Sequence, residues 1–435
     1  MKPVTAVMVG AGQRGLYAYG PYALEHPDEL KFVAVAEPDP ERREKFARMH
    51  NIPKEMQFET WEELMEKGRI ADVVFNMTMD RVHFASTMRA LEIGYDVLLE
   101  KPMAHTAEHS AALVLMAERT GRLLQVCHVL RYTTFFRKLK ELLDDGVIGE
   151  PITVEHKENL VWWHMAHSFV RGNWRKAGTS TPMIVAKCCH DFDILYWNIG
   201  RKAVKIHSAG SLKHFRPENA PEGAPESCLD PCPVRETCPY DVHKIYLNMK
   251  IKGWPVNAIT NDLSYEGRLR ALRESNYGKC VFHSDNDVVD HQVVNIEFEN
   301  GVTVAMTMNG HGFEESRTMR YDGPEGTLRG KFDYRHGVIE IHPHFWGKSP
   351  IKVDVSPSES GHGGGDFGMV RGFLRAVRGL EPPLTSATNS LESHFMAFAA
   401  EESRLTGRVV EMENYRSEIM RKAEEIVREW TGRRR

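Results

Sequence analysis

The sequence predicts an α/β protein in which an N-terminal, doubly wound parallel sheet precedes an α+β domain with a large, mostly antiparallel open sheet. Three observations support this fold class. The chain opens on an apolar run that ends in a glycine-rich turn, short apolar runs then alternate with helical segments up to residue 126, and two later runs meet at Asn300-Gly301. Strands that alternate with helices favour a parallel sheet, whereas an Asn-Gly pair between two strands favours a hairpin.

The first strand and its turn have the spacing of a dinucleotide-binding site. Residues 4–9 are apolar and rich in β-branched side chains, and Gly10, Gly12 and Gly15 follow in the pattern G-x-G-x-x-G. The first glycine permits a tight turn, the second lets a pyrophosphate approach the backbone, and the third lets the next helix pack on the strand. Free N–H groups at the start of that helix favour phosphate. We count the intervening Gln13 and Arg14 as cofactor-binding, and a purely structural turn is the alternative.

A second apolar strand, over residues 32–36, ends in the acid Glu37. Dinucleotide-binding folds place an acid about 20 residues past the glycines, where it binds the ribose hydroxyls. A carboxylate here would repel a 2′-phosphate, so we expect NAD rather than NADP. Arg42 and Arg43 lie close enough in the sequence to leave NADP open.

The remaining segments of this domain continue the alternation of strand and helix. Asp39 and Thr106 are residue types that cap helices, and Gly94 and Gly121 are placed to end them. These signals predict strands at residues 71–76, 96–99 and 123–126. They also predict one helix that begins at Pro40 and further helices at residues 61–67, 80–93 and 107–118.

Five segments, in order, resemble the Gfo/Idh/MocA family of relatives of glucose–fructose oxidoreductase and inositol dehydrogenase. They are GAGQRG at the first turn, NMTMDRVHF after the third strand, LLEKP at the fourth, HVLRY after the fifth and KCCHDFDIL further on. The resemblance implies a Rossmann domain over residues 1–127 that binds NAD(P), and a substrate-binding and oligomerisation domain over residues 128–435. It also implies site residues within these segments, namely Thr78, His83 and Glu100 for the cofactor and Arg131 and Tyr132 for the substrate.

Lys101, in the EKP segment, is the first candidate catalytic residue. It follows the carboxyl end of a strand, where doubly wound sheets bind ligands, and Pro102 fixes the backbone after it. By resemblance, its side chain points to the junction of nicotinamide and substrate. Its ammonium could bind a substrate hydroxyl there and lower the pKa of that hydroxyl during hydride loss. A surface lysine beside a proline is the alternative interpretation.

His190 and Lys187 are the other catalytic candidates. His190 and Asp193 lie one helical turn apart, and the family's histidine performs acid–base chemistry on the substrate hydroxyl. The family often has an aspartate four residues before this histidine, but here Ala186 occupies that position and Lys187 follows it. Lys187 could therefore carry the proton or bind a substrate oxygen. We also count Asp191 as a substrate contact.

An aromatic segment over residues 162–175 suits a sugar as substrate. Aromatic rings can stack on the apolar face of a sugar while neighbouring polar groups bind its hydroxyls. A partly buried loop with core tryptophans is the alternative to a sugar-binding site. A metal site in this segment would lack a nearby acid or cysteine to complete the set of ligands. The substrate contacts expected in this segment are Trp162, Trp163, His164, His167, Arg171 and Trp174.

Three cysteines stand among prolines at spacings of four and six, at Cys228, Cys232 and Cys238. In a reducing compartment, such a cluster more often binds a metal than forms disulfides. We expect a structural zinc ion that fixes an insertion at about residues 213–285, with an iron–sulfur cluster or no metal as alternatives. A tetrahedral site needs a fourth ligand, for which Cys280 is the first candidate and His243 and His283 are alternatives.

The second domain is expected to be built from strands that alternate apolar and polar residues. Such runs occur at residues 152–158, 292–299, 302–308, 327–332 and 337–342. The GHGGGD segment at residues 361–366 precedes a helix from residue 367, which Asp366 could cap, and it would place His362 at the rim of the substrate pocket. Two further helices are expected at residues 390–406 and 414–430.

Composition excludes several classes of protein. The formal net charge is −4, whereas nucleic-acid-binding proteins usually carry a basic excess. No apolar run reaches the length of a membrane span, and no signal-peptide pattern follows Met1. We therefore expect a cytoplasmic protein with reduced cysteines, with neither nucleic acid nor membrane as partner. The open sheet is expected to join subunits into a homodimer or homotetramer.

These inferences predict an NAD-dependent oxidoreductase that oxidises a secondary hydroxyl of a small-molecule sugar, cyclitol or glycoside. The alternative is an NAD-dependent glycosidase, which oxidises C3, eliminates the aglycone, adds water and reduces the ketone with the bound NADH. HSFVRGNWR and GHGGGD favour it in part, because the extra histidines could supply another acid or base. A third class is a sugar-binding or regulatory protein without activity, against which the intact EKP and H-x-x-D segments count.

Overall fold

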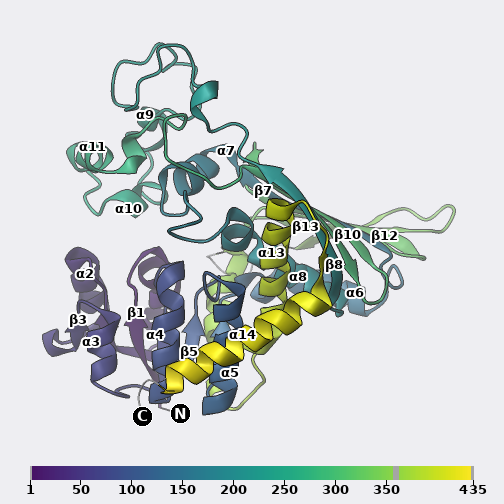
Figure 1. Ribbon diagram of the computed structural model, residues 1–435, viewed down its shortest axis with the longest axis horizontal. Coiled ribbons are helices and arrows are strands. Elements are labelled where there is room, and N and C mark those ends of the chain that lie inside the picture. Colours follow the sequence, from purple (N-terminus) through teal and green to yellow (C-terminus); the bar gives the residue numbers. More distant parts are fainter. Residues whose placement is uncertain (1, 356–361, 433–435) are drawn as a thin grey trace.

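The computed structural model describes residues 2–355 and 362–432 and contains one parallel and one mostly antiparallel sheet (Figure 1). The parallel sheet has the strand order β3-β2-β1-β4-β5-β6, which confirms the predicted doubly wound fold. Its central pair is β1 (Val4–Val9) and β4 (Val73–Asn76). After β1, the chain adds β2 and then β3 on one side of β1, and it places β4 on the other side. The carboxyl ends of β1 and β4 therefore flank the switch point at which such sheets bind ligands.

The helices of this domain begin and end at the capping residues that the sequence indicates. The Asp39 side chain accepts a hydrogen bond from the Arg42 N–H, and Thr106 accepts one from the His109 N–H. The remaining elements are η1 (Arg14–Tyr19), α1 (Gly20–Glu25), β2 (Leu30–Ala36), α2 (Pro40–His50), η2 (Lys54–Met56), β3 (Gln57–Phe58), α3 (Trp61–Glu66), α4 (Asp80–Ile93), β5 (Asp96–Leu99), α5 (Ala107–Thr120), β6 (Leu124–Val126) and η3 (Val129–Tyr132).

The second sheet has nine strands in the order β14-β13-β12-β11-β7-β10-β9-β8-β15. All neighbouring strands are antiparallel except β7 and β10. Gly301 has a φ of +80° between β9 and β10, which confirms the Asn-Gly hairpin. The strands are β7 (Thr153–Val161), β8 (Ala203–Ser211), β9 (His291–Phe298), β10 (Thr303–Gly312), β11 (Ser316–Asp322), β12 (Gly326–Phe332), β13 (Gly337–Pro343), β14 (Ile351–Val355) and β15 (Val410–Glu411).

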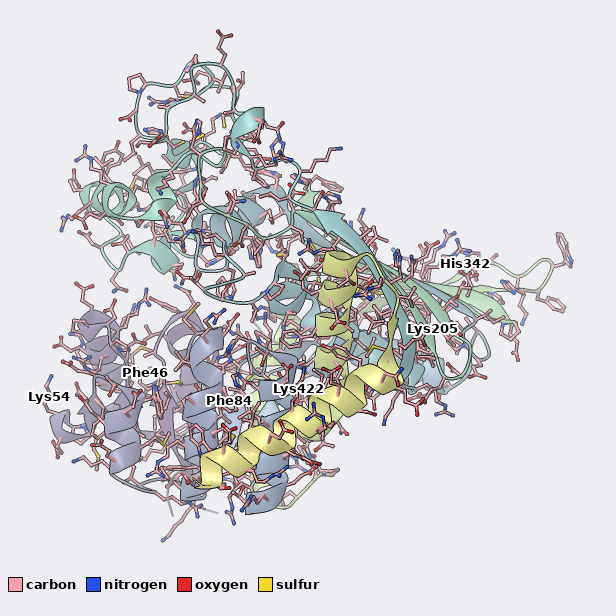
Figure 2. The ribbon with its side chains drawn as sticks, viewed as in Figure 1. Phe46, Lys54, Phe84, Lys205, His342 and Lys422 are labelled. Atoms are coloured by element: carbon pink, nitrogen blue, oxygen red, sulfur yellow. The ribbon has the colours of Figure 1, made fainter. Side chains whose placement is uncertain are left out.

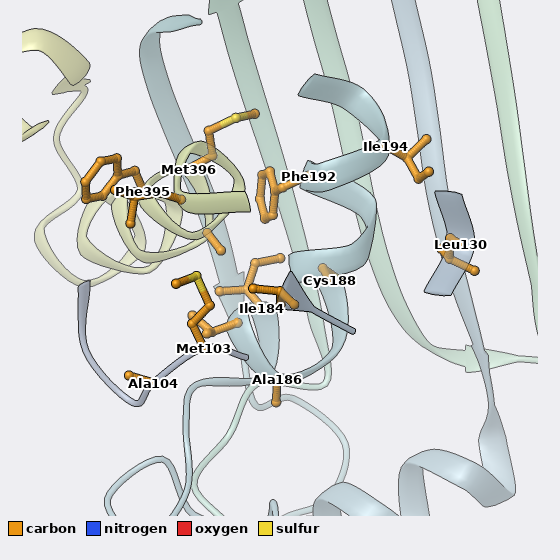
Figure 3. Close-up of a cluster of buried hydrophobic side chains, with 14 of the residues drawn as sticks. Met103, Ala104, Leu130, Ile184, Ala186, Cys188, Phe192, Ile194, Phe395 and Met396 are labelled. Atoms are coloured by element: carbon orange, nitrogen blue, oxygen red, sulfur yellow. The ribbon is translucent and has the colours of Figure 1, made fainter. Parts of the chain in front are cut away.

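Two long buried helices, α8 (Met183–Ile199) and α13 (Ala387–Thr406), pack between the larger sheet and the first domain. Figure 3 shows Phe192 of α8 pointing toward Met396 of α13, and both belong to the same buried cluster as Met103 of the loop after β5. Burying a side chain such as Phe192 contributes about 2 kcal/mol to folding. This core fixes the first turns of α8 against the parallel sheet. Among the helices of the described residues, none combines the length and apolar character needed to cross a bilayer.

After β14 the chain returns to the first domain, and only β15 of the larger sheet follows later. α12 (Gly365–Val377) packs its Phe373 ring against Phe75 of β4, with ring centroids 5.8 Å apart. α14 (Met412–Gly432) crosses α5, where Lys422 lies 3.6 Å from Glu108 (Figure 2). The helical layers of the parallel sheet therefore include two segments from the C-terminal part of the chain. α6 (Thr134–Asp144) connects the two domains.

The insertion at residues 213–285 leaves the larger sheet between β8 and β9 and extends to the side of α2 (Figure 1). It has a small core of its own, which includes Val242, Tyr246 and Leu272. Asn261 donates a hydrogen bond of 2.9 Å to Glu41 of α2, so the insertion contacts the first domain directly. Its regular elements are short: η5 (Pro217–Asn219), α9 (Val242–Ile245), α10 (Val256–Ile259), α11 (Tyr265–Glu274) and η6 (Asn276–Gly278).

Candidate active site

The glycine turn after β1 is closely packed on one side and open on the other. Gly10 has a φ of +88°, and a Cβ there would lie 2.6 Å from the Met77 carbonyl oxygen. A Cβ on Gly15 would lie 2.6 Å from the Gly10 carbonyl oxygen. Nothing of the protein lies within 4 Å of the Cβ position on Gly12. This open space is where a pyrophosphate could approach the backbone.

Glu37, at the end of β2, is bound to this turn. Its carboxylate accepts hydrogen bonds from the N–H groups of Ala11 (2.7 Å) and Asp39 (3.1 Å). The Arg43 guanidinium is turned to the main chain, where it donates to the Glu37 carbonyl oxygen (2.5 Å). Arg42 lies 3.7 Å from Asp39. The acid is therefore held beside the glycine turn, where the sequence predicts a contact with the ribose, and the two arginines are engaged elsewhere.

The Arg14 side chain joins the glycine turn to two acids. It donates to Glu100 (2.7 Å), to Asp366 of α12 (2.8 Å) and to the Tyr19 hydroxyl. The sequence predicts that Arg14 binds the cofactor, but its guanidinium is already engaged with these carboxylates. We therefore assign it a positioning role, because it fixes the turn relative to the end of β5 and to α12.

The other predicted cofactor residues bind the loops around the switch point. Gln13 donates to the Asn257 carbonyl oxygen of α10 at 2.9 Å, so the insertion reaches the glycine turn. Thr78 donates its hydroxyl proton to the side-chain oxygen of Asn76 at 2.8 Å. The buried His83 ring lies 2.9 Å from the Thr78 carbonyl oxygen and 2.7 Å from that of Pro102. The buried His83 ring therefore connects the loop after β4 to the loop after β5.

Lys101 spans the two domains. Its ammonium donates a 2.7 Å hydrogen bond to the Ala186 carbonyl oxygen in the first turns of α8, and its backbone N–H donates to Glu100. Burial would raise the pKa of Glu100, but Arg14 and Lys101 outweigh it and lower that pKa. The carboxyl end of β5 and the start of α8 are thereby brought together, and with them the three predicted catalytic residues.

His190, on α8, is almost fully buried beside His128, with ring centroids 5.5 Å apart. Its Nδ1 has no hydrogen-bond partner within residues 2–355 and 362–432. Burial, and then the charges of Lys101 and nearby groups, lower the pKa of His190 well below its usual value. The imidazole is therefore neutral at neutral pH, and it can accept a proton.

Lys187, three residues earlier on α8, is held by two acids. Its Nζ lies 2.9 Å from Glu315 and 3.2 Å from Glu158. Burial alone would lower the pKa of Lys187, but these carboxylates outweigh it and raise that pKa above its ordinary value. The His164 Nδ1 lies 3.1 Å from the same Glu315 carboxylate. Lys187 is therefore held as an ammonium by two carboxylates, and its expected role as a proton carrier or as a group that binds a substrate oxygen stays a prediction.

Three expected substrate contacts have buried side chains that are bound to other groups of the protein, and their contact with a substrate stays a prediction. Asp191 contacts His156 (2.7 Å) and Arg317 (2.8 Å); burial would raise its pKa, but these groups lower it to about 2. The Arg131 guanidinium donates two 2.7 Å hydrogen bonds to Asp193, the acid of the H-x-x-D segment. Tyr132 accepts a 3.1 Å hydrogen bond from Gln125. These networks hold α8, β7 and β11 in place.

The aromatic segment divides into an accessible and a buried part. Trp163 and the half-exposed Trp254 of the insertion lie with ring centroids 4.9 Å apart, and Trp254 also contacts the rings of His164 and His167. The remaining side chains are engaged in the fold: Trp162 packs on Tyr240, His167 lies 2.9 Å from the Tyr246 hydroxyl, Trp174 donates to Asp80 of α4, and Arg171 donates to the carbonyl oxygens of Lys279 and Tyr240.

His362 lies at the start of α12, and Gly361 before it lies outside the described residues. Its Nδ1 is 2.9 Å from Asp366 and 3.2 Å from the Arg14 guanidinium. The ring also contacts Tyr334 edge-on. Asp366 was expected to cap the helix, but the cap is Gly364, because the Asp366 carboxylate is used by His362 and Arg14.

The four predicted metal-binding cysteines, Cys228, Cys232, Cys238 and Cys280, line one small cavity together with Asp241. Across the described ranges, no group of three or more His, Cys, Asp or Glu side chains has the arrangement of a preformed metal site. The alternative ligands contact residues that line this cavity: the His243 ring lies 3.0 Å from Asp241, and the His283 ring lies 3.2 Å from the Ala224 carbonyl oxygen.

Sequence reasoning missed several groups that complete the site. Glu315 joins Lys187 to His164 although it is 128 residues from Lys187 in the chain. It follows β10, at the point where GHGFEES places two acids together, and this pair is the only sequence signal. The other missed groups are Glu158, Arg317, His128, Trp254 and Tyr334.

Two family models match the chain. The model described as the oxidoreductase family, NAD-binding Rossmann fold (Gfo/Idh/MocA), matches residues 4–128, and that described as the oxidoreductase family, C-terminal alpha/beta domain, matches residues 140–412. Together they extend over both sheets and all three predicted catalytic residues.

Individual relatives agree with this family. YteT of Bacillus subtilis (strain 168) is 24% identical over 352 residues, which are 77% of this chain and 80% of YteT. Inositol 2-dehydrogenase 4 of Saccharopolyspora erythraea is 30% identical over 193 residues, which are 44% of this chain and 52% of that protein. An oxidoreductase from Agrobacterium radiobacter, solved in complex with NAD+, L-tartaric acid and magnesium, has a TM-score of 0.67 at 16% identity and covers 95% of this chain and 99% of its own. The last comparison shows the fold.

Proposed function

Because the chain belongs to the Gfo/Idh/MocA oxidoreductase family and has its NAD-binding Rossmann domain, we propose that it oxidises a secondary hydroxyl of a sugar, cyclitol or glycoside with NAD. One observation carries this proposal: the 2.7 Å hydrogen bond from Lys101 to Ala186 brings the end of β5 to the helix that holds Lys187 and His190. Bound NAD would supply the hydride acceptor. Gly12 would admit its pyrophosphate, and Glu37 would bind its ribose.

His190 is the proposed base. Its neutral imidazole can take the proton of the substrate hydroxyl while the hydride leaves the carbon that bears this hydroxyl. A ketone then forms, and no charge is left on the substrate. A histidine of low pKa is a weak base, and Lys101 compensates by binding the substrate oxygen and lowering the pKa of the hydroxyl. Lys187 remains charged beside Glu315 and serves as a hydrogen-bond donor to the substrate.

A carbohydrate substrate is supported by the accessible aromatic pair and by a named relative. The rings of Trp163 and Trp254 lie beside His164, so an apolar ring face and a polar group adjoin. Inositol 2-dehydrogenase 4 acts, by its name, on a cyclitol. NAD rather than NADP is supported by Glu37 at the ribose position and by Arg43, which is turned to the main chain.

The NAD-dependent glycosidase is the second candidate, and two carboxylate–imidazole pairs favour it. The His164 ring contacts Glu315 at 3.1 Å, and the His362 ring contacts Asp366 at 2.9 Å. An oxidation–elimination–addition–reduction cycle needs a further acid and base besides the group that takes the hydroxyl proton. Either pair could supply one.

One experiment separates these candidates. The NAD-loaded protein is incubated with a panel of cyclitols, free sugars and aryl glycosides while NADH absorbance and released aglycone are followed together. A dehydrogenase accumulates NADH in proportion to the substrate consumed, whereas the glycosidase releases aglycone without net NADH. His190→Ala should reduce either rate by roughly 10² to 10⁴, and Lys54→Met, on the distant η2, should not. Absence of both signals with every compound, in protein that binds NAD, would contradict the proposal.

We also propose that copies of this chain pair in the cytoplasm through the open face of the larger sheet. Alternate residues of β9 and β10 are exposed, although both strands lie in the middle of the sheet. Light scattering should give the mass of a dimer or tetramer, and the mass of a monomer at micromolar concentration would contradict this pairing.

A further inference from the structure

Four cysteines from two distant chain segments meet at one cavity in the insertion. Cys228, Cys232 and Cys238 come from one loop, and Cys280 comes from a segment 42 residues or more further along. The cavity has a volume of about 20 Å³, and all four side chains are free thiols. A space of this size accommodates about one water molecule or one ion.

The backbone, and not only the cavity, fixes the two segments together. Ser227 and Lys279 form an isolated antiparallel bridge, the Cys228 N–H donates to the Gly278 carbonyl oxygen, and the Cys280 N–H donates to the Glu226 carbonyl oxygen, both at 2.8 Å. Cys228 and Cys280 therefore flank the Ser227–Lys279 bridge on its two sides. The turn that carries Cys232 and Cys238 is closed by a 2.8 Å hydrogen bond from the Cys238 N–H to the Val234 carbonyl oxygen.

A buried arginine that forms no ion pair with the described residues lies near two of these thiols. Arg171 is 1% exposed; its guanidinium donates to the carbonyl oxygens of Lys279 (2.7 Å) and Tyr240 (2.9 Å), and the third nitrogen, Nη1, has no partner among the described residues. No carboxylate of those residues forms an ion pair with it. The guanidinium acts electrostatically on the thiols of Cys228 and Cys238. A buried charge without an ion pair is costly, and the thiolates of a metal complex would add to the negative charge that Asp241 already brings to this cavity.

We propose that Cys228, Cys232, Cys238 and Cys280 bind one Zn²⁺ ion as thiolates, with Arg171 as the positioning residue that offsets the negative charge of the complex. Four thiolates around one Zn²⁺ leave a net negative charge, which accounts for the buried guanidinium and its free N–H. The thiols do not form a preformed ligand set, so binding turns these side chains toward the cavity.

The ion would join the insertion to the active-site segment. Arg171 ends the helical segment that begins at Met165 and includes His167, and His164 immediately precedes it. The insertion otherwise has only a small apolar core, and metal binding energy in such a segment is folding energy. The zinc ion therefore has a structural role that is distinct from the proposed hydride transfer, and its test does not depend on activity.

The test measures zinc and iron in the full chain purified without chelator. We expect about one zinc per chain in the native protein, at least a tenfold lower content in Cys280→Ser, and an unchanged content in Cys127→Ser, which alters a buried cysteine outside the cavity. Arg171→Met should weaken zinc binding about tenfold in competition with a chelator, and Arg171→Lys should restore part of it.

Three results would overturn this proposal: a native protein without zinc, iron with sulfide in its place, or zinc that persists in Cys280→Ser. If Cys280→Ser fails to fold, a titration of the native protein still tests whether the cysteines bind the zinc. Titration of its cysteines with a mercurial must release the zinc, and zinc retained after all seven have reacted would exclude thiolate ligation.

Discussion

The protonation states of single side chains decide which chemistry the site can perform. Glu315 and Glu158 hold Lys187 as an ammonium, whereas burial and neighbouring cations hold His190 neutral. The sequence indicates both residues as proton carriers and cannot separate them. The structure distinguishes the two residues, because only the neutral imidazole of His190 has a ring nitrogen that can accept a proton.

Replacing Glu315 with glutamine tests the state of Lys187. Burial disfavours the ammonium, so loss of one of its two anionic partners lowers the pKa of Lys187. The alkaline limb of kcat/KM against pH should therefore move to lower pH in Glu315→Gln. The neighbouring Glu314→Gln, which removes a partner of Lys331, should keep the native profile. An unshifted limb in Glu315→Gln would show that the reaction does not need the charge on Lys187.

The predicted site residues show where reasoning from the sequence ends at this scale. Lys101, Lys187 and His190 could be proposed as site residues because each stands in a short segment with a typical pattern. Glu315 could not, because its partner is 128 residues away and only the strand arrangement brings the two together. Arg131 and Asp193 belong to such segments as well, yet they bind each other inside the fold. A polar residue in a motif can hold the fold as easily as it can bind a substrate.

At the scale of elements, we assign the cofactor's pyrophosphate to the strand–turn–helix unit at residues 4–25. Gly12→Ala tests it, because its Cβ would meet nothing in the protein but would occupy the space proposed for the pyrophosphate. We expect a melting temperature equal to or slightly above that of the native protein and at least tenfold weaker NAD binding, measured by calorimetric titration. Gly178→Ala, at another open position, should change neither. Native NAD affinity in Gly12→Ala would mean that the dinucleotide does not cross this turn.

Elements with local signals could be predicted, and those set by tertiary contacts could not. Asp39, Thr106, Gly94 and the Asn300-Gly301 pair all act as the sequence indicates. The π-helical turn at Arg14–Tyr19 was missed, since it accompanies the bonds of Arg14 to Glu100 and Asp366. β8, β11 and β14 were also missed, because their pairing partners, more than their own residues, make them strands.

At the scale of the whole molecule, buried histidines make stability depend on pH. Burial, as the main cause, lowers the pKa of His167 and of His394 to about 3. The unfolded chain takes up a proton at each below about pH 6.5, and the folded protein does not, so the free energy of unfolding falls as the pH falls through this window. The slope is on the order of 1.4 kcal/mol per pH unit for each fully buried histidine.

Melting temperatures at pH 7 and pH 5 check this dependence. We expect a lower value at pH 5, with a smaller drop in His167→Phe and the native drop in His336→Gln, which changes an exposed ring. Carboxylates of low pKa, such as Asp191, lose their contribution only below about pH 4, where the unfolded acids become protonated. A melting temperature that rises on acidification to pH 5 would contradict the neutral state of the buried histidines.

The two sheets could be predicted at this scale, and the way the chain joins them could not. Alternating strands and helices indicate the first sheet, and alternating polarity with a hairpin signal indicates the second. No local pattern shows that α12 packs on β4 or that α14 crosses α5. The same holds for the insertion, whose contact with the glycine turn depends on a single hydrogen bond from Gln13 to Asn257.

The most direct test of the central claim is a single-turnover measurement on the NAD-saturated protein. A polyol identified by the substrate panel is mixed rapidly with it, and NADH absorbance is recorded. A transient of up to one NADH per chain is expected for a dehydrogenase and for a glycosidase alike. Lys101→Met should slow it at least a hundredfold while leaving the NAD dissociation constant within a few-fold of native. A transient of native rate in Lys101→Met would contradict the meeting of Lys101, Lys187 and His190 at the reacting alcohol.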